Sequence, residues 1–202
     1  EEAVKKVTVG LEKKERVISD KDKKLTAYHE AGHAVVGRYL STQSNVKEVS
    51  IIPRGVAGGY TMYKSDEDKY YISKTEMQER LTALLGGRAA EKLVLNDIST
   101  GASNDIEVAT NIARDMVTKY GMSDKLGPID FKGKEPYEMQ LFGENIGDAI
   151  GQEVKLLIDS AYERAQKLLI EHRDKLEIIA QTLLEKEKIN ETEFNRIFEE
   201  EL

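Results

Sequence analysis

Residues 27–36 have the sequence Ala-Tyr-His-Glu-Ala-Gly-His-Ala-Val-Val, and this stretch decides the fold. Small and apolar side chains recur around it at helical spacing, which predicts a helix over Lys23–Leu40 with Asp22 as its N-terminal cap. His29 and His33 are four residues apart, so both imidazole rings project from the same face of that helix. The sequence has only 3 His, and two of them lie here.

Two neutral imidazoles on consecutive turns can bind one metal ion. Zinc suits such ligands, and it keeps room for a third ligand and a water molecule. Glu30 is poorly placed to join the same set of ligands. Its carboxylate can instead accept a proton from water as the water attacks a carbonyl carbon, and then pass that proton to the leaving amine. The motif therefore predicts zinc-dependent hydrolysis with Glu30 as the catalytic residue.

The third metal ligand is less well defined by the sequence. A catalytic zinc ion usually has three protein ligands and one open position. A histidine six residues beyond His33 is excluded, because Tyr39 stands there. The remaining candidates are Glu48, Glu91, Asp97, Asp105 and His172. Asp105 is expected in the first turn of a helix, where an ionised carboxylate is favoured. Spacing alone does not choose among Glu91, Asp97 and Asp105.

Hydrophobic periodicity and turn signals predict the other elements. We expect two neighbouring strands, a helix opened by a Ser73–Glu76 capping box, a helix that ends at Gly121, a long loop, and C-terminal helices with a break near His172. The corresponding ranges are 46–52 and 60–63 for the strands, 73–95 and 103–120 for the helices, 122–145 for the loop and 146–202 for the C-terminal helices. The predicted fold class is α+β, mainly α-helical, with a zinc-binding helix beside a small β-sheet, followed by a C-terminal helical bundle.

The composition limits the class of protein. Its 202 residues include 37 Asp and Glu against 30 Lys and Arg, a formal net charge of −7. Such an acidic balance argues against a nucleic-acid partner. Cysteine is absent, which excludes disulfides and thiolate–zinc sites. No apolar run is long enough to cross a bilayer. Because the chain begins without Met, we expect it to be a fragment of a longer protein.

The zinc motif and several further segments resemble the peptidase core of the FtsH family, the membrane-anchored ATP-dependent zinc metalloproteases. These segments occur in the expected order and cover nearly the whole chain. They are residues 27–36, Ser50-Ile-Ile-Pro-Arg-Gly, Gly59-Tyr-Thr, Leu84-Leu-Gly-Gly-Arg-Ala-Ala-Glu, Ser99-Thr-Gly-Ala-Ser-Asn-Asp-Ile and Tyr120-Gly-Met-Ser-Asp-Lys-Leu-Gly-Pro.

The resemblance implies that Asp105 is the third zinc ligand and that Glu91 is a nearby supporting residue. It also implies one zinc ion per subunit and an edge strand over about 58–63 that pairs with an extended substrate. Strand addition is a sound way to bind many different sequences. The substrate-binding residues would be Gly58, Gly59, Tyr60 and Thr61. Packing within the sheet is an equally good interpretation for Tyr60.

The resemblance further implies the context of the whole protein. Residues 1–20 would be the remnant of a linker to an AAA+ ATPase domain, and 21–202 the peptidase domain, with a catalytic core over 21–121. The chain contains no Gly-x-x-x-x-Gly-Lys-Ser/Thr loop, so ATP and Mg²⁺ would bind only in the missing ATPase domain. Membrane contact would arise only through missing N-terminal segments.

On this interpretation the protein is a homo-hexamer at the bacterial inner membrane, with this domain facing the cytoplasm. It would degrade misfolded or short-lived membrane and cytosolic proteins, which it would bind as extended chains. Two alternatives remain at this point. One is a non-catalytic helical module that assembles into a ring and keeps a structural zinc, and the other is a peptidase for short peptides that has no unfoldase partner.

Overall fold

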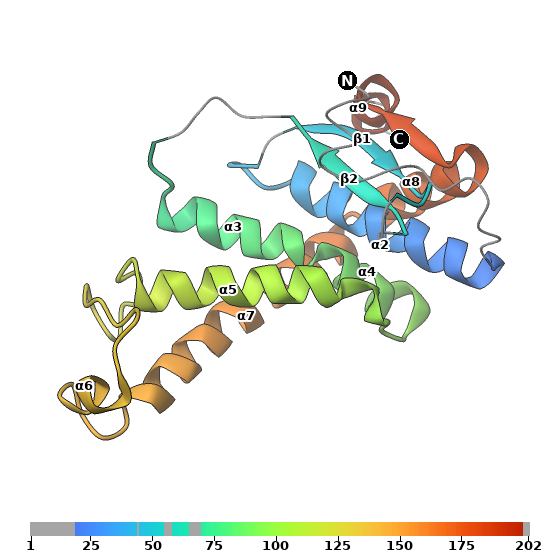
Figure 1. Cartoon of the computed structure of the whole chain (residues 1–202). Coiled ribbons are helices and arrows are strands. Elements are labelled where there is room, and N and C mark those ends of the chain that lie inside the picture. Colours follow the sequence, from blue (N-terminus) through green and yellow to red (C-terminus); the bar gives the residue numbers. More distant parts are fainter. Residues whose placement is uncertain (1–18, 44, 55–57, 65–69, 200–202) are drawn as a thin grey trace.

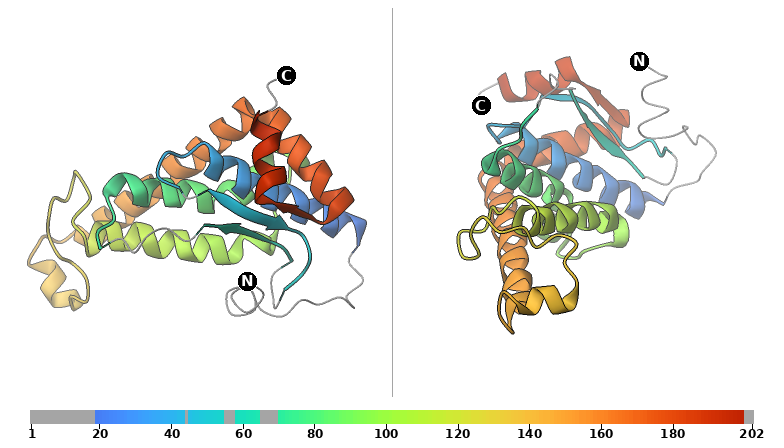
Figure 2. Two further views of the ribbon diagram at one scale, coloured as in Figure 1. Left: turned by 90° about the horizontal axis from the view of Figure 1, so that it is seen from above. Right: turned by 60° about the vertical axis from the view of Figure 1, so that its left-hand side comes forward.

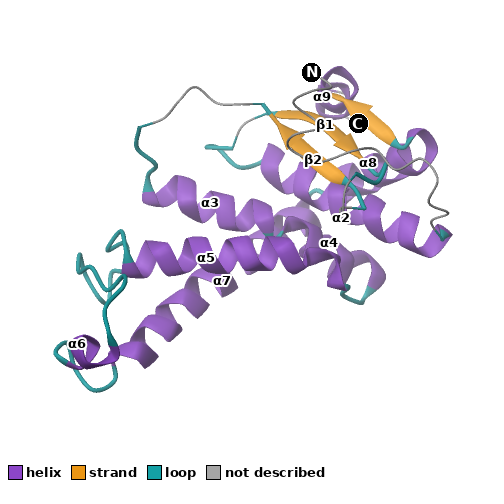
Figure 3. Ribbon diagram, in the orientation of Figure 1, coloured by secondary structure: helices purple, strands orange, loops and turns teal. Residues whose placement is uncertain are grey.

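The computed structural model describes residues 19–43, 45–54, 58–64 and 70–199. A small antiparallel sheet lies over helix α2, and most of the remaining chain is helical (Figure 1; Figure 3). This arrangement confirms the predicted α+β, mainly helical fold class. The division into a linker, a catalytic core, a loop and C-terminal helices stays a prediction. The linker predicted over 1–20 lies outside the described residues except for its last two.

Helix α2 (Asp20–Arg38) carries the motif at the centre of the sequence. Its N-terminal cap is Ser19, whose hydroxyl accepts a hydrogen bond from the Asp22 backbone N–H at 3.1 Å. The predicted cap, Asp22, was therefore wrong: the helix starts two residues before that position. Every residue from Ala27 to Gly37 is buried, so the helix has no solvent-exposed face over this stretch. The burial follows from its central place, because the sheet, α4 and α8 all pack against α2.

The sheet has three strands in the order β2-β1-β3, with both pairings antiparallel. Strands β1 (Val46–Ser50) and β2 (Tyr60–Tyr63) lie within the two ranges predicted as neighbouring strands. Strand β3 (Lys188–Asn190) was not predicted, because three residues are too few to show an alternating pattern. It pairs with β1 and so leaves β2 at one edge of the sheet (Figure 2).

The single helix predicted over 73–95 is in fact two helices, α3 (Lys74–Leu84) and α4 (Gly86–Leu95), which meet at Leu85. The Ser73–Glu76 capping box that opens α3 is confirmed. The break lets α4 approach α2 at a contact between two glycines. A Cβ atom on Gly32 would stand 2.5 Å from the Gly86 carbonyl oxygen, so only glycine permits this close helix crossing. Gly32 thus has the packing role that its cost within a helix suggests.

Helix α5 (Ser103–Thr118) follows the short 3₁₀ turn η1 (Thr100–Ala102). After it, Gly121 adopts a left-handed conformation with φ of +59°, in agreement with the predicted stop. The loop predicted over 122–145 contains a short helix, α6 (Pro136–Gln140). This segment is anchored to the body of the protein: the Ser123 hydroxyl donates to the Glu153 carboxylate at 2.6 Å.

The C-terminal helices are α7 (Ile146–Glu171), α8 (Arg173–Lys186) and α9 (Glu191–Glu199). The break predicted near His172 is confirmed, since that residue separates α7 from α8. The Asn190 side chain accepts a hydrogen bond from the Glu193 backbone N–H at 3.0 Å at the start of α9. In Figure 1, α5 and α7 lie side by side and extend away from the sheet toward α6. Within the described ranges, no helix combines the length and apolar character needed to cross a bilayer.

Two clusters of buried apolar side chains form the core. The larger cluster joins α2 to the sheet, α4, α8 and α9, and includes Val35, Val49 and Phe194. The smaller cluster joins α3, α5 and α7, and includes Leu81 and Met116. Helix α4 connects the two, because it packs against both α2 and α7.

Candidate metal centre

His29 and His33 face one another across consecutive turns of α2, with 3.0 Å between their Nε2 atoms. Both side chains are buried. A carboxylate oxygen of Asp105, in the first turn of α5, lies 3.3 Å from each of these two nitrogens. The three side chains are the only group among the described residues in which three His, Cys, Asp or Glu ligand atoms come close enough to share a metal ion.

The other nitrogen of each imidazole fixes the direction of its ring. His29 Nδ1 lies 2.6 Å from Glu91 Oε1, and His33 Nδ1 lies 2.8 Å from the Ala83 carbonyl oxygen. Since a carbonyl or carboxylate oxygen accepts, both Nδ1 atoms donate. Each Nε2 therefore faces the Asp105 carboxylate. There it can share a proton with the carboxylate when no metal is bound or, once deprotonated, coordinate a metal ion.

The other candidates for the third ligand lie elsewhere. Glu91 is buried and accepts a hydrogen bond from the Ser99 backbone N–H at 2.7 Å, so its two oxygens contact His29 and the backbone. Glu48 is 2.9 Å from Lys188, and His172 stacks on Tyr39. Asp97 is exposed. Of the five carboxylates and imidazoles that the sequence left open, only Asp105 faces both Nε2 atoms.

The spacing of the three ligand atoms fits a zinc ion. With Zn–N and Zn–O distances of about 2.0–2.1 Å, a tetrahedral site places its ligand atoms roughly 3.4 Å apart. The observed separations are 3.0 Å between the imidazoles and 3.3 Å from each imidazole to Asp105. Two imidazole nitrogens with one carboxylate oxygen are also a ligand set that zinc accepts in catalytic sites.

The electrostatics of the site favour a cation. Burial lowers the pKa of His29, but hydrogen bonds with Asp105 and Glu91 outweigh it and raise the pKa to about 10. Burial alone would raise the pKa of Asp105, yet hydrogen bonds from the two imidazoles hold that pKa well below its usual range. A group of carboxylates that stabilises a proton so strongly also attracts a divalent ion, in competition with that proton.

Gly87, on α4, makes room for the centre. A Cβ atom at this position would stand 2.5 Å from His29 Nε2 and 2.6 Å from His33 Nε2, which is closer than real atoms approach. Any side chain here would therefore press on the two ligand nitrogens. The run of small residues around Gly87 favours tight helix packing, but no sequence pattern indicates that the imidazoles are its neighbours.

Glu30 lies on α2 between the two imidazoles and is buried. Its carboxylate accepts a hydrogen bond from the Thr61 hydroxyl at 2.8 Å. Burial raises its pKa above the usual value, although His33, His29 and Thr61 act in the opposite direction. The raised pKa suits a group that must both take and release a proton.

The metal centre opens into a cleft of about 940 Å³. Its lining includes His29, Glu30, His33 and Asp105, together with all four predicted substrate-binding residues: Gly58, Gly59, Tyr60 and Thr61. Tyr60 nevertheless has a packing contact, because its hydroxyl donates to the buried Glu48 carboxylate at 2.5 Å. Two arginines that the sequence did not single out, Arg54 and Arg80, also line the cleft.

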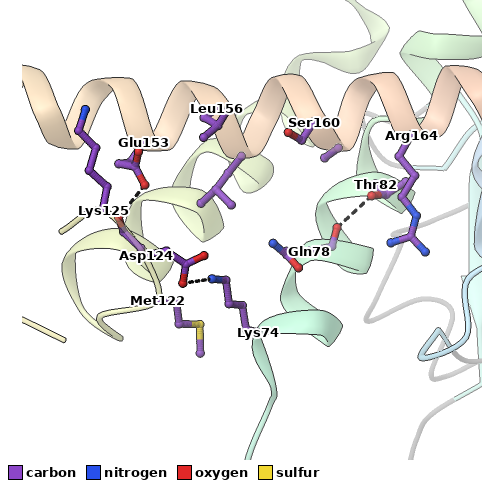
Figure 4. Close-up of a pocket in the computed structure, with 13 residues that line it drawn as sticks. Lys74, Gln78, Thr82, Met122, Asp124, Lys125, Glu153, Leu156, Ser160 and Arg164 are labelled. Atoms are coloured by element: carbon purple, nitrogen blue, oxygen red, sulfur yellow. Dashed lines mark hydrogen bonds and ion pairs between the residues drawn. The ribbon is translucent and has the colours of Figure 1, made fainter. Parts of the chain in front are cut away.

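A second cavity, of about 480 Å³, lies between α3, α7 and the segment that follows α5 (Figure 4). Three of its charged side chains form ion pairs: Lys74 with Asp124 at 2.9 Å, and Arg164 with Glu79 at 2.9 Å. None of the predicted site residues lines it. The cleft at the metal centre is therefore the one that combines ligand atoms, a buried acid and an exposed opening.

Comparison with known proteins agrees with this geometry. The family model of peptidase family M41 matches residues 16–197. The chain belongs to peptidase family M41.

Proteins with similar sequences come from several bacteria. The chain is 54% identical over 206 residues to "ATP-dependent zinc metalloprotease FtsH 1" of Thermoanaerobacter sp. (strain X514), covering 98% of the chain and 34% of that relative. It is 46% identical to "ATP-dependent zinc metalloprotease FtsH" of Thermotoga maritima, with 100% and 34% covered, and 43% identical to the Bacillus subtilis protein of the same name, with 98% and 33% covered. The chain spans about a third of the length of these curated relatives.

Proposed function

We propose that the chain is a zinc metalloendopeptidase domain in which His29, His33 and Asp105 bind the ion and Glu30 is the catalytic residue. The observation that carries this proposal is the convergence of the three ligand atoms within 3.3 Å of one another, beside a buried carboxylate and in an open cleft. Membership of a peptidase family and the zinc metalloproteases among its relatives support the same conclusion.

When bound, zinc supplies Lewis acidity that polarises the scissile carbonyl and lowers the pKa of water. The protein's own groups do the rest. Glu30 accepts a proton from the attacking water and passes it to the nitrogen of the leaving amine. Glu91 holds the His29 ring in its tautomer, and the Ala83 carbonyl does the same for His33.

The proposed substrate is an extended polypeptide bound along the outer edge of β2. This strand is at the edge of the sheet, and no other strand of the described residues pairs with that side. The Lys64 backbone N–H donates to the Asn45 carbonyl oxygen at 2.8 Å, toward β1. Because alternate residues of an antiparallel strand face the same neighbour, Thr61 directs its backbone groups toward the outer edge. An extended chain can pair with them whatever its side chains are.

The context of the whole protein forms part of the proposal. The names of the relatives and the resemblance to the FtsH family support ATP-dependent degradation of misfolded or short-lived proteins, with ATP and Mg²⁺ bound by a separate ATPase domain. The resemblance also supports a homo-hexamer at the bacterial inner membrane, with this domain on the cytoplasmic side.

The alternative of a non-catalytic module with a structural zinc is not favoured. A structural site has four protein ligands and no open position, whereas only three ligand atoms converge here among the described residues. The other alternative, a peptidase limited to short peptides, is distinguished by its choice of substrate. Such an enzyme would not cleave a long unfolded protein such as casein, whereas the proposed endopeptidase would.

The substitution Glu30→Gln tests the proposal. It removes the proton acceptor but keeps the size of the side chain, so zinc content should stay at one ion per chain while casein cleavage falls by roughly 10²- to 10⁴-fold. Glu163→Gln, the same change at an exposed position of α7, serves as the control and should keep full activity. Casein cleavage that survives Glu30→Gln would refute the role of Glu30. Zinc content that survives Asp105→Ala would refute the ligand set.

A further inference from the structure

The face of β2 that points toward α2 contacts the metal-binding helix at successive alternate residues. Thr61 donates to the Glu30 carboxylate, and the Tyr63 hydroxyl donates to the His33 carbonyl oxygen at 3.0 Å. Just before the strand, Gly59 faces the same helix. Side chains two residues apart on a strand lie on one face, so these contacts form a continuous row. The edge strand and the catalytic helix are therefore in direct contact at the proposed active site.

Thr61 holds the Glu30 carboxylate from one side. Its hydroxyl lies 2.8 Å from Glu30 Oε2 and 3.2 Å from the Glu30 carbonyl oxygen. The shorter distance, and the charge on the acceptor, favour donation to the carboxylate. Among the residues that the structure describes, no other side chain donates a hydrogen bond to this group.

Gly59 leaves the space that the Glu30 side chain fills. A Cβ atom at Gly59 would stand 2.9 Å from Glu30 Cγ and 2.7 Å from the Ser50 carbonyl oxygen. The glutamate therefore passes against a bare stretch of backbone before its carboxylate meets the Thr61 hydroxyl. Together, Gly59 and Thr61 restrict the Glu30 side chain to one position, although it could otherwise rotate about three bonds.

We propose that Thr61 is a positioning residue that fixes the Glu30 carboxylate for proton transfer. The proposal rests on the proposed function, because it gives Glu30 its catalytic task. A glutamate has several rotamers, and losing that freedom has a free-energy cost. The hydrogen bond from Thr61 offsets this loss of rotamer freedom when the protein folds. The carboxylate is therefore already oriented when substrate arrives.

The geometry also separates the two tasks of Thr61. Its backbone groups face the outer edge of β2, where an extended substrate would pair, and its hydroxyl faces Glu30. Changing the side chain leaves the backbone groups in place. Loss of the hydroxyl should therefore lower kcat and leave KM nearly unchanged, whereas damage to the strand would raise KM as well.

The test compares zinc-loaded Thr61→Val and Thr61→Ser proteins on an unstructured fluorogenic peptide and on casein. Valine has the same shape as threonine and an equal preference for strands, so it removes little besides the hydroxyl. We expect Thr61→Val to reduce kcat roughly 10- to 100-fold, because that factor corresponds to the loss of one hydrogen bond to a charged group. KM should stay within about twofold of the wild-type value. Thr61→Ser should retain most of the activity, and both variants should keep one zinc ion per chain.

Two further variants sharpen the comparison. In a Glu30→Gln background, Thr61→Val should cause no additional loss, because the threonine acts through the glutamate. Thr182→Val makes the same chemical change on α8, where the hydroxyl donates to the Ile178 carbonyl oxygen of its own helix, and should behave as wild type. A crystal structure of Thr61→Val should show the Glu30 carboxylate displaced from its place beside β2.

The outcomes distinguish this inference from the proposed function. If wild-type protein loaded with zinc cleaves neither substrate, the proposed function fails and the role of Thr61 fails with it. If wild type cleaves and Thr61→Val matches its kcat, only the positioning role is overturned. Equal losses in the Val and Ser variants, or a rise in KM that accounts for the whole effect, would likewise overturn it.

Discussion

Gly87 is the residue whose replacement should damage the metal centre most directly. Alanine there would place a methyl group 2.5 Å from His29 Nε2 and 2.6 Å from His33 Nε2. Because α4 packs tightly against α2, the backbone has little room to move away. We expect Gly87→Ala to fold but to bind less than a tenth of the zinc bound by wild type, as measured by metal analysis after dialysis.

The matched control for Gly87→Ala is Gly151→Ala on α7. A Cβ atom at Gly151 has nothing within 4 Å, so alanine there meets open space. This variant should keep its zinc and gain up to about 1 kcal/mol of stability from the better helix propensity. Full zinc content in Gly87→Ala would show that the two imidazoles do not share an ion at the position inferred.

The sequence predicts some parts of the site better than others. The juxtaposition of His29 and His33 follows from helical spacing, since a separation of four residues is a local property. Asp105 lies far along the chain, and only packing of α5 brings it to the imidazoles, so the choice of Asp105 came from the family resemblance. The contact of Thr61 with Glu30 also depends on tertiary packing, and no sequence pattern announces it.

At the scale of elements, Glu79 of α3 ties three segments together. Its buried carboxylate accepts hydrogen bonds from the Thr42 backbone N–H at 2.7 Å, from the Thr42 hydroxyl at 2.8 Å and from Arg164 of α7 at 2.9 Å. Burial acts to raise the pKa of Glu79, but these contacts outweigh it and leave the pKa below its ordinary value. The ionised form therefore stabilises the native state.

This shift gives a prediction for stability against pH. A depressed native pKa adds stability that is complete above the unfolded-state pKa, about 4.3, and is lost as pH falls through the native value. Glu79→Gln should therefore lower the free energy of unfolding by about 1–3 kcal/mol at pH 7, measured with urea. The difference from wild type should shrink below about pH 4, where wild type loses the same charge.

The control for this titration is Glu163→Gln, which removes an exposed carboxylate from the same helix that carries Arg164. Its free energy of unfolding should stay close to wild type at both pH values. A Glu79→Gln deficit that is the same at pH 7 and in acid would mean that the charge of Glu79 adds no stability.

Sequence patterns predict the elements well where a feature is local, as for the Ser73–Glu76 capping box and the break at His172. They fail where long-range packing decides. The division between α3 and α4 at Leu85 is not marked by proline, and it brings Gly86 against Gly32. Strand β3 forms because it pairs with the edge of β1, which lies far earlier in the sequence. In this pairing Ser50 stands opposite Lys188.

At the scale of the whole molecule, the metal centre joins two clusters of the core. His29 and His33 lie on α2, which belongs to the larger cluster, and Asp105 lies on α5, which belongs to the smaller one. An ion bound by all three would connect the two clusters as well as carry the chemistry. The sequence predicts the α+β class but not this division, because both clusters combine segments that are distant along the chain.

Crystals of the Glu30→Gln variant, with diffraction measured on both sides of the zinc absorption edge, test the ligand set most directly. We predict one anomalous peak per chain, about 2.0–2.2 Å from His29 Nε2, His33 Nε2 and an Asp105 oxygen, with a fourth position that no protein atom fills. A peak without Asp105 among its neighbours, or one enclosed by four protein ligands, would contradict the account.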